Sequence, residues 1–436
     1  ATRVNAQGLV ENVQILSSNL VSNGNFSQEG VQEVSNGSFS QEGAEQVTNG
    51  NFATDTDWTK QTSWSISGGS ANYDFLSDSK YIRQTLLNGG FVAGKTYKIN
   101  FEITSGTAYM NVNSNGGGLI SLNTYSVGSY SIYVTPSISA SDLLFYGRNT
   151  SGTAFSIDNV SVVEVGQDWI LGTGWSIGED KALNTGGANF SDLTQLNTDI
   201  IIGKNYKITY TVSDYVSGSF KFIMNSNTTA GLERNADGTY TDYLTSSAPA
   251  YSFRTQGSGF NGSITNISVK EVGQNWTLGT GWSIGDGEAI FDYDTNINAI
   301  YTSNLSLNLS NSYKLSFEIK NVLSGTPNIY IANSSGGVGY NGDYTNYSEG
   351  VHTLIFSPTS NQTTLSFFAR YSDFSITNIS VIEITDDTNL PRINYEGFSY
   401  QDSLGSEEVV NGDFATDSNW IKNGQVTIGG GVAYFN

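Results

Sequence analysis

The sequence predicts an all-β protein: three tandem antiparallel β-sandwich (jelly-roll) domains in a rod, with a partial fourth repeat at the C-terminus. Three observations predict this fold. All seven tryptophans fall in one repeated motif, two further landmarks recur in step with it, and the segments between turns alternate apolar and polar residues. No long stretch has an apolar period of 3.6 residues, and Gly and Asn interrupt the chain throughout, so we expect no helix.

The tryptophan motif marks the start of each repeat. It reads DWTKQTSW from Asp57, DWILGTGW from Asp168 and NWTLGTGW from Asn275. A fourth copy, NWIKNGQV from Asn419, has Val426 in place of the second tryptophan. The period of roughly 110 residues is the size of a two-sheet sandwich of many short strands.

The second landmark predicts a half-buried strand in every repeat. It reads GKTYKINFEI from Gly94, GKNYKITYTV from Gly203 and NSYKLSFEI from Asn311. Apolar and polar residues alternate strictly in the first and third copies, which is typical of an antiparallel strand with one face in the core.

The third landmark closes each repeat and contains a phase slip. It reads FSIDNVSVVEV from Phe155, SITNISVKEV from Ser263 and FSITNISVIEI from Phe374. Two apolar residues that should both face inward are three positions apart, as in Ile157 and Val160. One extra residue must be absorbed, so we expect a β-bulge at Asp158-Asn159 and at the matching places in the other repeats.

These landmarks divide the chain into five parts. We expect an N-terminal connector with repeated NGNF strands (1–46), three jelly-roll repeats (47–166, 167–273 and 274–386), and a connector with the start of a fourth repeat (387–436). The joints VEVGQDW and KEVGQNW contain no flexible linker, so the repeats are expected to form a stiff rod.

Near the N-terminus, the NGNF phrase occurs in more copies than the one repeat that follows it requires. It starts at Val21, Val34 and Val47, and returns at Val409. Only the third and fourth copies directly precede a tryptophan motif, and repeats two and three have no copy of their own. The extra copies are either spare duplicated strands, or strands that pair with another repeat or another chain. From the second alternative we expect an oligomer or end-to-end assembly, with 21–46 or 407–436 contacting a neighbouring chain.

Charge and composition exclude several classes of function. The net charge is −21 with no basic cluster, so we expect neither nucleic-acid binding nor docking on anionic lipid. No apolar run is long enough to span a membrane. There is no cysteine, and His352 is the only histidine. Forty acidic residues always allow some carboxylate pair, but no pair recurs across the repeats and no catalytic motif is present. We therefore expect a non-enzymatic protein.

Together, the NGNF phrase, the paired tryptophans, GKTYKINFEI and IDNVSVVEV resemble the jelly-roll carbohydrate-binding modules of families four and nine. The flanks ATRVNAQGLVENV and NLPRINYEGFSYQDSLG resemble stretches that frame such modules in bacteriophage tail and appendage proteins. The resemblance implies a structural or adhesive virion appendage, a phage fibre or decoration segment, with host-surface glycans, copies of itself or other virion proteins as partners. The alternative is a module array of a bacterial surface or secreted protein, accessory to polysaccharide binding or degradation.

Tyrosines in loops that differ between repeats are the candidate glycan contacts. Aromatic rings stack on sugar C–H faces, and turns rich in Gly and Asn present them well. The alternative is that these rings begin a strand and cover the sheet edge. The paired tryptophans keep a fixed register, which favours packing over ligand contact. The candidates are Tyr125, Tyr240, Tyr243, Tyr344 and Tyr347.

The same resemblance implies a possible structural calcium in the first repeat. Family members often have Glu after the NGNF phenylalanine, where this chain has Ala53 or Ala415. The aspartate of the closing phrase is present as Asp158, and we match Asn266 and Asn378 to it in the other repeats. Asp158 is thus a candidate calcium ligand or, alternatively, a side-chain cap for the bulge.

Overall fold

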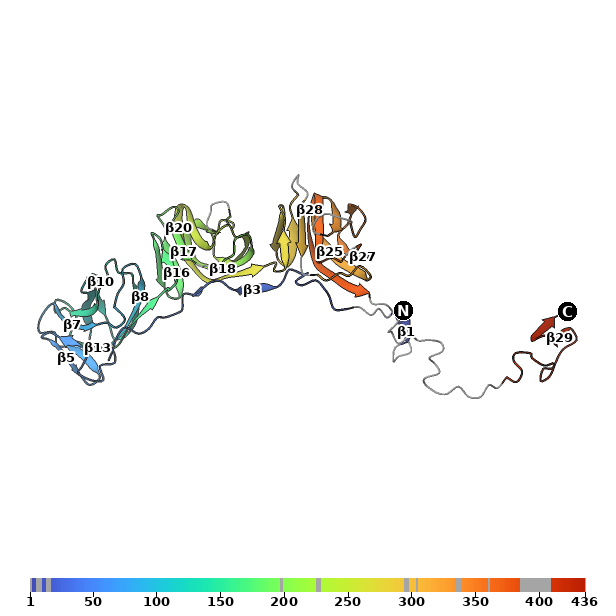
Figure 1. Ribbon diagram of the computed structural model, residues 1–436. Coiled ribbons are helices and arrows are strands. Elements are labelled where there is room, and N and C mark those ends of the chain that lie inside the picture. Colours follow the sequence, from blue (N-terminus) through green and yellow to red (C-terminus); the bar gives the residue numbers. More distant parts are fainter. Residues whose placement is uncertain are drawn as a thin grey trace.

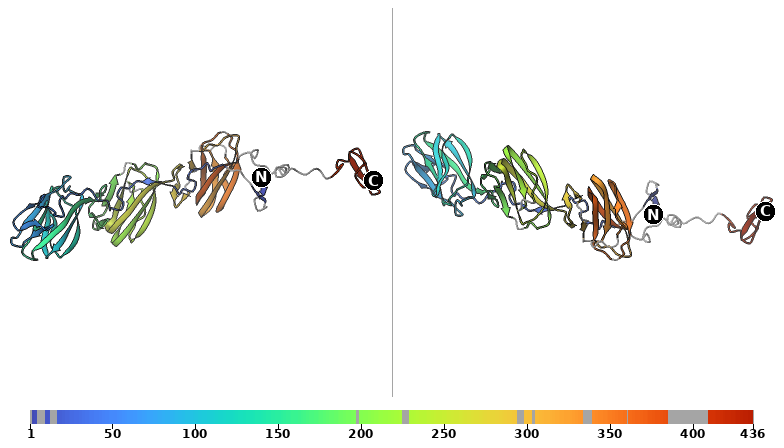
Figure 2. Two further views of the ribbon diagram at one scale, coloured as in Figure 1. Left: turned by 90° about the horizontal axis from the view of Figure 1, so that it is seen from below. Right: turned by 90° about the horizontal axis from the view of Figure 1, so that it is seen from above.

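The protein is three β-sandwiches in a row (Figure 1). The structure, a computed structural model, describes residues 2–4, 10–12, 17–196, 199–224, 229–293, 298–302, 305–333, 339–359, 361–384 and 409–435. We call the sandwiches of the three predicted repeats unit 1, unit 2 and unit 3. Figure 2 shows that the units stay in line when the molecule is viewed from below and from above. The described residues form strands and turns only, so no helix among them could cross a membrane.

Unit 1 shows the jelly-roll arrangement most simply. Its two antiparallel sheets have the strand orders β10–β9–β12–β7–β4 and β11–β8–β13–β6–β5. Their inward side chains form one core that contains the tryptophan pair of the unit. The strands are β4 (Thr59–Lys60), β5 (Trp64–Ser67), β6 (Ser70–Tyr73), β7 (Lys80–Thr85), β8 (Thr96–Ser105), β9 (Ala108–Ser114), β10 (Gly117–Tyr125), β11 (Gly128–Val134), β12 (Asp142–Gly147) and β13 (Phe155–Val165).

Units 2 and 3 repeat this order with longer strands that bend from one sheet into the other. In unit 2 the strands are β14 (Ile170–Leu171), β15 (Trp175–Gly178), β16 (Lys181–Thr185), β17 (Asp192–Leu196), β18 (Asn205–Ile223), β19 (Gly238–Thr245) and β20 (Ala250–Val272). In unit 3 they are β21 (Trp276–Leu278), β22 (Trp282–Gly285), β23 (Glu288–Phe291), β24 (Asn298–Thr302), β25 (Ser312–Ala332), β26 (Thr345–Asn346), β27 (Gly350–Phe356) and β28 (Leu365–Ile384). The predicted all-β jelly-roll fold is confirmed.

The predicted bulge is present in the closing strand of every unit. In β13 the pairing with β8 shifts between Asp158 and Ser161. The residue in the bulge is Asn159, with φ of 50°, and Asn266 and Asn378 have the same conformation in β20 and β28. Asparagine tolerates this left-handed region better than most residues. The three asparagines are therefore equivalent, and our matching of Asp158 to Asn266 and Asn378 was wrong by one position.

The N-terminal segment 17–46, here called the strap, runs along all three units in the reverse of their chain order. Leu20 N donates to Val381 O of unit 3 at 2.8 Å, and Gln46 N donates to Val162 O of unit 1 at 2.9 Å. Between these points β3 (Glu29–Gln32) pairs antiparallel with the end of β20 in unit 2. Each closing strand thus gains a partner along its last residues. In Figure 1 the label β3 marks the part of the strap that pairs at the end of unit 2.

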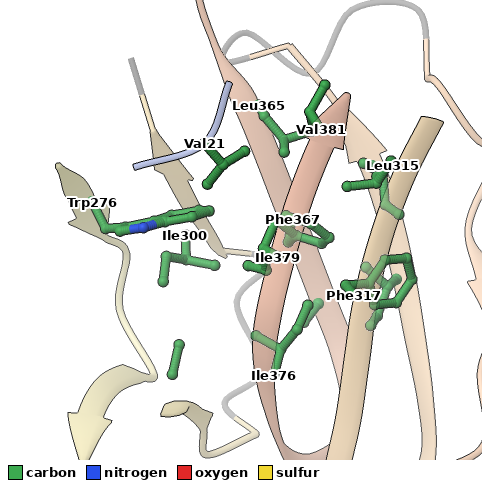
Figure 3. Packing of buried hydrophobic residues seen from close by; sticks show 14 of the residues in the cluster. Val21, Trp276, Ile300, Leu315, Phe317, Leu365, Phe367, Ile376, Ile379 and Val381 are labelled. Atoms are coloured by element: carbon green, nitrogen blue, oxygen red, sulfur yellow. The ribbon is translucent and has the colours of Figure 1, made fainter. Parts of the chain in front are cut away.

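Each NGNF phrase inserts into one unit in the same way. The phrase glycine accepts a hydrogen bond from the residue after the bulge asparagine: Ile379 N to Gly24 O, Ile267 N to Gly37 O and Val160 N to Gly50 O, all at 2.9 Å. The phrase phenylalanine packs on the first tryptophan of the unit, with ring centroids 5.1 Å apart in all three units. Figure 3 shows the first phrase in unit 3, where Val21 lies beside Trp276 and the end of β28.

The extra phrases are therefore the missing opening segments of units 2 and 3. Phrase one completes unit 3, phrase two completes unit 2, and phrase three completes unit 1, which directly follows it. Of the alternatives raised by the sequence, pairing with another unit of the same chain is the one that the structure shows. Residues 21–46 thus have partners within the chain, and contact of 21–46 or 407–436 with a neighbouring chain stays a prediction.

Charged pairs hold the strap at both junctions between units. Glu29 lies 2.7 Å from Lys207 and 2.9 Å from Lys270, and Glu42 lies 2.7 Å from Lys98. Hydrogen bonds from Lys207 and Lys270 lower the pKa of Glu29 below its usual value. Because these side chains are partly exposed, each pair contributes at most about 1 kcal/mol, and the apolar phrases anchor the strap more strongly.

Acid should loosen the strap at the junction between units 2 and 3. A carboxyl group with a lowered pKa stabilises the fold above its unfolded pKa, and this stability is lost as the pH falls through the folded value. We expect amide protection of β3 against hydrogen exchange to fall as the pH drops below 4.5, the ordinary value for Glu29. Glu29→Gln should show the lower protection already at neutral pH. Equal pH dependence in both proteins would contradict the role of Glu29.

The fourth NGNF phrase forms the same local structure, and no described residues build a sandwich around it. Trp420 Nε1 donates to Asn411 O at 2.8 Å, and its ring lies 5.0 Å from that of Phe414. The following hairpin, β29 (Val426–Gly429) and β30 (Val432–Phe435), pairs only with itself among the described residues. Trp420 is 41% exposed, whereas Trp58 is 6% exposed. The partial fourth repeat is thus a phrase, a tryptophan and one hairpin. Residues 1–16 also contain a short hairpin, β1 (Thr2–Val4) with β2 (Val10–Asn12).

Candidate functional site

The outer face of one sheet of unit 3 carries the most favourable set of side chains for binding a ligand. In the second half of β25, Ile329 and Ile331 point into the core, so Asn328 and Tyr330 point outward. In β28, Phe367 and Ala369 are buried, so Phe368 and Arg370 point outward next to them. The alternation of the two strands thus places polar and aromatic groups on one surface.

Arg370 contacts two tyrosines of this surface. Its guanidinium carbon is 3.6 Å from the ring centroid of Tyr344 and 4.9 Å from that of Tyr371. Arg370 Nε donates to Asn328 Oδ1 at 2.6 Å, which fixes the plane of the guanidinium group. Asn328 Nδ2 in turn donates to Asn346 Oδ1 at 2.6 Å.

Further aromatic rings extend the surface on both sides of Arg370. The ring of Tyr330 lies 5.3 Å from that of Tyr344 and 6.0 Å from that of Phe368. On the other side, Tyr293 lies 5.8 Å from Tyr371, and both are largely exposed, at 43% and 57%. Burial raises the pKa of Tyr344, against the effect of Arg370, so the phenol is neutral at physiological pH. We call these residues the tyrosine–arginine face: Tyr293, Asn328, Tyr330, Tyr344, Asn346, Phe368, Arg370 and Tyr371.

This arrangement suits a sugar chain better than a small apolar molecule. Aromatic rings offer flat apolar surfaces, while planar amides and the guanidinium group offer hydrogen bonds at fixed positions. The corresponding sheet of unit 1 has a similar but smaller set, with Tyr81 5.3 Å from Tyr146 and Arg148 Nε donating to Asn111 at 3.2 Å. In unit 2 the same sheet instead presents the ion pair Arg254–Asp192, at 2.7 Å.

Of the predicted tyrosines, only Tyr344 belongs to the tyrosine–arginine face. Tyr347 is nearby in sequence, but its ring packs edge-on against the core residue Phe317 at 5.2 Å. Tyr125 is 4% exposed and packs against Phe101, so it faces the core of unit 1. These two rings match the alternative that loop tyrosines cover a sheet.

Tyr240 and Tyr243 lie on β19 of unit 2 and have structural partners. The guanidinium carbon of Arg234 is 4.6 Å from the centroid of the Tyr240 ring. Tyr243 OH donates to Asp286 Oδ1 of unit 3 at 3.1 Å, so Tyr243 belongs to the junction between units. The first tryptophan of each pair packs on the strap or its own phrase, and the second lies in the core, so the packing interpretation of the tryptophans is confirmed.

Asp158 uses a carboxylate oxygen to cap the bulge. Its Oδ1 accepts a hydrogen bond from Asn159 N at 2.7 Å. Within the described part of the chain, no three acidic or histidine side chains gather closely enough to hold a metal ion. The cap agrees with the alternative raised for this residue, and calcium binding at Asp158 stays a prediction.

Two grooves contain none of the residues of the tyrosine–arginine face. One, of about 350 Å³, follows the joint between units 1 and 2 and is lined by Lys95, Glu164 and Trp169 among others. The second, of about 280 Å³, lies in unit 3 beside Glu288 and Phe374. Both are near the lower end of the size range of ligand pockets, and each has a lining side chain in an ion pair: Lys95 with Glu164, and Glu288 with Lys320.

Several residues of the face were not singled out from the sequence. Asn328, Tyr330 and Arg370 lie in strands, whereas the predicted contacts were tyrosines expected in loops. The signal was present in the alternation of TPNIYIA from Thr326, in which Asn328 and Tyr330 occupy the face opposite the isoleucines.

Comparisons with known proteins give structural likenesses with low similarity scores. No family model matches the chain, and no curated protein matches its sequence. Among solved structures, the tandem CBM22-1–CBM22-2 domain of Paenibacillus barcinonensis Xyn10C is 8% identical over 56% of this chain and 99% of its own, with a TM-score of 0.22. A triple jelly-roll protein of an archaeal virus turret is 12% identical over 75% of this chain and 89% of its own, with a TM-score of 0.16. Allantoicase from Saccharomyces cerevisiae is 7% identical, covering 47% and 82%, with a TM-score of 0.22. Values this low carry no argument about function.

Proposed function

We propose that this protein is a non-enzymatic adhesive rod whose unit 3 binds glycans on its tyrosine–arginine face. The observation that carries the proposal is the central group of Tyr344, Arg370 and Asn328, held in fixed orientation on a sheet surface by ring stacking and hydrogen bonds. A rigid row of rings and planar polar groups matches the alternating apolar and hydroxyl surfaces of a sugar chain.

Tyr344→Ala should weaken retention on cell-surface polysaccharide about tenfold, since a lost aromatic contact costs about 1 kcal/mol or somewhat more. The ring is half-buried at the surface rather than in the core, so the melting temperature should change little. Retention in affinity electrophoresis and thermal unfolding should be measured on the same preparations.

Tyr240→Ala is the matched control, because it removes a tyrosine stacked under an arginine in unit 2 and leaves unit 3 intact. We expect it to retain polysaccharide like the unchanged protein. Equal loss in both variants, or loss only when unit 3 also unfolds, would contradict glycan binding at this face.

We further propose a virion appendage, a phage fibre or decoration segment, as the setting of this rod, with a bacterial surface or secreted module array as the alternative. The linear stack of three units held together by the strap (Figure 1) supports an elongated appendage that has its binding face in unit 3. Detection of the protein in purified particles would support the first setting, and a catalytic domain in the same reading frame would support the second.

A further inference from the structure

We infer that the ligand of the tyrosine–arginine face carries a carboxylate, as in a chain of uronic acid units. This inference rests on the proposed function and specifies its ligand. The observation behind it is that Arg370 displays a guanidinium group with no carboxylate within 4 Å among the described residues.

Every other arginine whose side chain the structure describes has an acidic partner. Arg254 and Arg234 pair with Asp192 and Asp242, and Arg83 and Arg148 pair with Asp142 and Asp78. In a chain with 40 acidic and 19 basic residues, an arginine without such a partner is an exception.

Arg148 of unit 1 occupies the position that matches Arg370, and a carboxylate neutralises its charge. Arg148 and Arg370 each follow the inward phenylalanine of their strand by three residues, Phe145 and Phe367. Each donates Nε to an asparagine of the neighbouring strand, Asn111 or Asn328. Arg148 then meets Asp78 at 3.8 Å, whereas Arg370 has no such neighbour among the described residues.

The free atoms of Arg370 have the geometry that a carboxylate needs. Its Nε is used by Asn328, and its two terminal nitrogens have no hydrogen-bond partner in the described part of the chain. The rings of Tyr344 and Tyr371 pack against the group, with centroids 3.6 and 4.9 Å from its central carbon. A guanidinium edge fixed in this way can donate two parallel hydrogen bonds to a carboxylate, which a freely rotating cation cannot do as well.

The acidic character of the whole chain does not prevent this contact. At physiological ionic strength, charges more than about 8 Å away are largely screened. Asp343 and Asp373, which bond residues of the face, already accept hydrogen bonds: Asp343 from Tyr344 N at 2.6 Å, and Asp373 from Tyr293 N and Ser324 Oγ, each at 2.7 Å.

The test compares polygalacturonate with the same polymer after methyl esterification, which keeps the sugar and removes the charge. We expect the full chain to bind the acidic polymer at least about tenfold more tightly in affinity electrophoresis, and to release it with rising salt. Arg370→Gln should lose this preference, and Arg370→Lys should keep only part of it, because lysine is a point charge without the planar fork. Arg148→Gln is the matched control and should bind like the unchanged protein.

The outcomes separate this inference from the proposed function. Equal binding of the ester and the acid would overturn the carboxylate assignment and leave glycan binding standing. Binding of neither polymer, nor of any other polysaccharide in a panel, would overturn both. Equally tight binding of poly-glutamate would show simple charge attraction, and preference for a sulfated polymer would show a different anion; either result would overturn the inference.

Discussion

Gly24→Ala should detach the strap from unit 3 and destabilise that unit by about 3 kcal/mol, the upper range for forcing extra atoms into a packed site. A Cβ at this position would lie 1.9 Å from Ile379 O, and the phrase cannot move away without breaking the bond from Ile379 N to Gly24 O. Hydrogen exchange of β28 and cleavage after Glu29 by a glutamate-specific protease should both increase.

Gly412→Ala is the control, since it makes the same change in the fourth phrase. There the nearest atom to an added Cβ is a side-chain carbon of Val409 at 3.2 Å, with no closing strand above it among the described residues. We expect no measurable change in unfolding. If Gly24→Ala behaved in the same way, the strap would not be an integral part of unit 3.

Trp169→Ala should destabilise unit 2 by about 4 kcal/mol, as expected for removing a large aromatic side chain from a core. The indole is 8% exposed and packs on Phe39 of the strap. Its Nε1 also donates to Asn36 O at 3.1 Å, so the substitution removes a bond to the strap together with the apolar contact. Loss of amide protection in β18 and β20, with β8 and β25 unchanged, would locate the effect in unit 2.

Trp420→Ala removes the same contacts at a place where the described part of the chain forms no core around them. Trp420 Nε1 donates to Asn411 O and its ring packs on Phe414, as the first tryptophan of each other repeat does with its phrase, but Trp420 is 41% exposed. We expect this substitution to reduce the stability by at most about 1 kcal/mol, with the effect confined to the hairpin. A large loss of stability in Trp420→Ala would mean that the phrase and tryptophan alone form the stable element.

The features predicted well from the sequence are those that depend on nearby residues. The alternation around Tyr97 and the three-residue step from Ile157 to Val160 specify a strand and a bulge within about ten positions. The partners of the extra phrases could not be obtained in this way, because phrase one meets unit 3 far along the chain, as in the bond from Trp276 Nε1 to Asn23 O with a separation of 253 residues.

The order of the phrases nevertheless has a simple physical reason. Phrase three directly precedes unit 1, so an extended strap leaving unit 1 meets unit 2 first and unit 3 next. About 13 residues separate the phrases, and an extended chain of that length spans roughly 40 Å, comparable to the step from one sandwich to the next. The missing copies in units 2 and 3, combined with this length, favour the arrangement that the structure shows over any other pairing within the chain.

The binding face was predicted only in part, because a loop tyrosine can point either toward solvent or toward the core. Tyr344 and Tyr347 are three residues apart in one loop, yet one faces outward over Arg370 and the other packs on Phe317. Which of them faces solvent depends on the register of β26 against β25, in which Asn346 pairs with Asn328. That register is a tertiary property, and the loop sequence does not specify it.

The reversed course of the strap decides how the molecule responds to a mechanical load. Ser17 N donates to Glu383 O at 3.3 Å, so the beginning of the strap and the end of β28 leave the array side by side, while unit 1 is at the far tip (Figure 1). Tension applied between these two points would break the hydrogen bonds of Ser17, Leu20 and Gly24 with β28 one after another. While these bonds break, units 1 and 2 carry no load. The three sandwiches therefore form a rod whose two outgoing chain segments both leave from unit 3. We expect the rod to resist force least when these two segments are pulled apart.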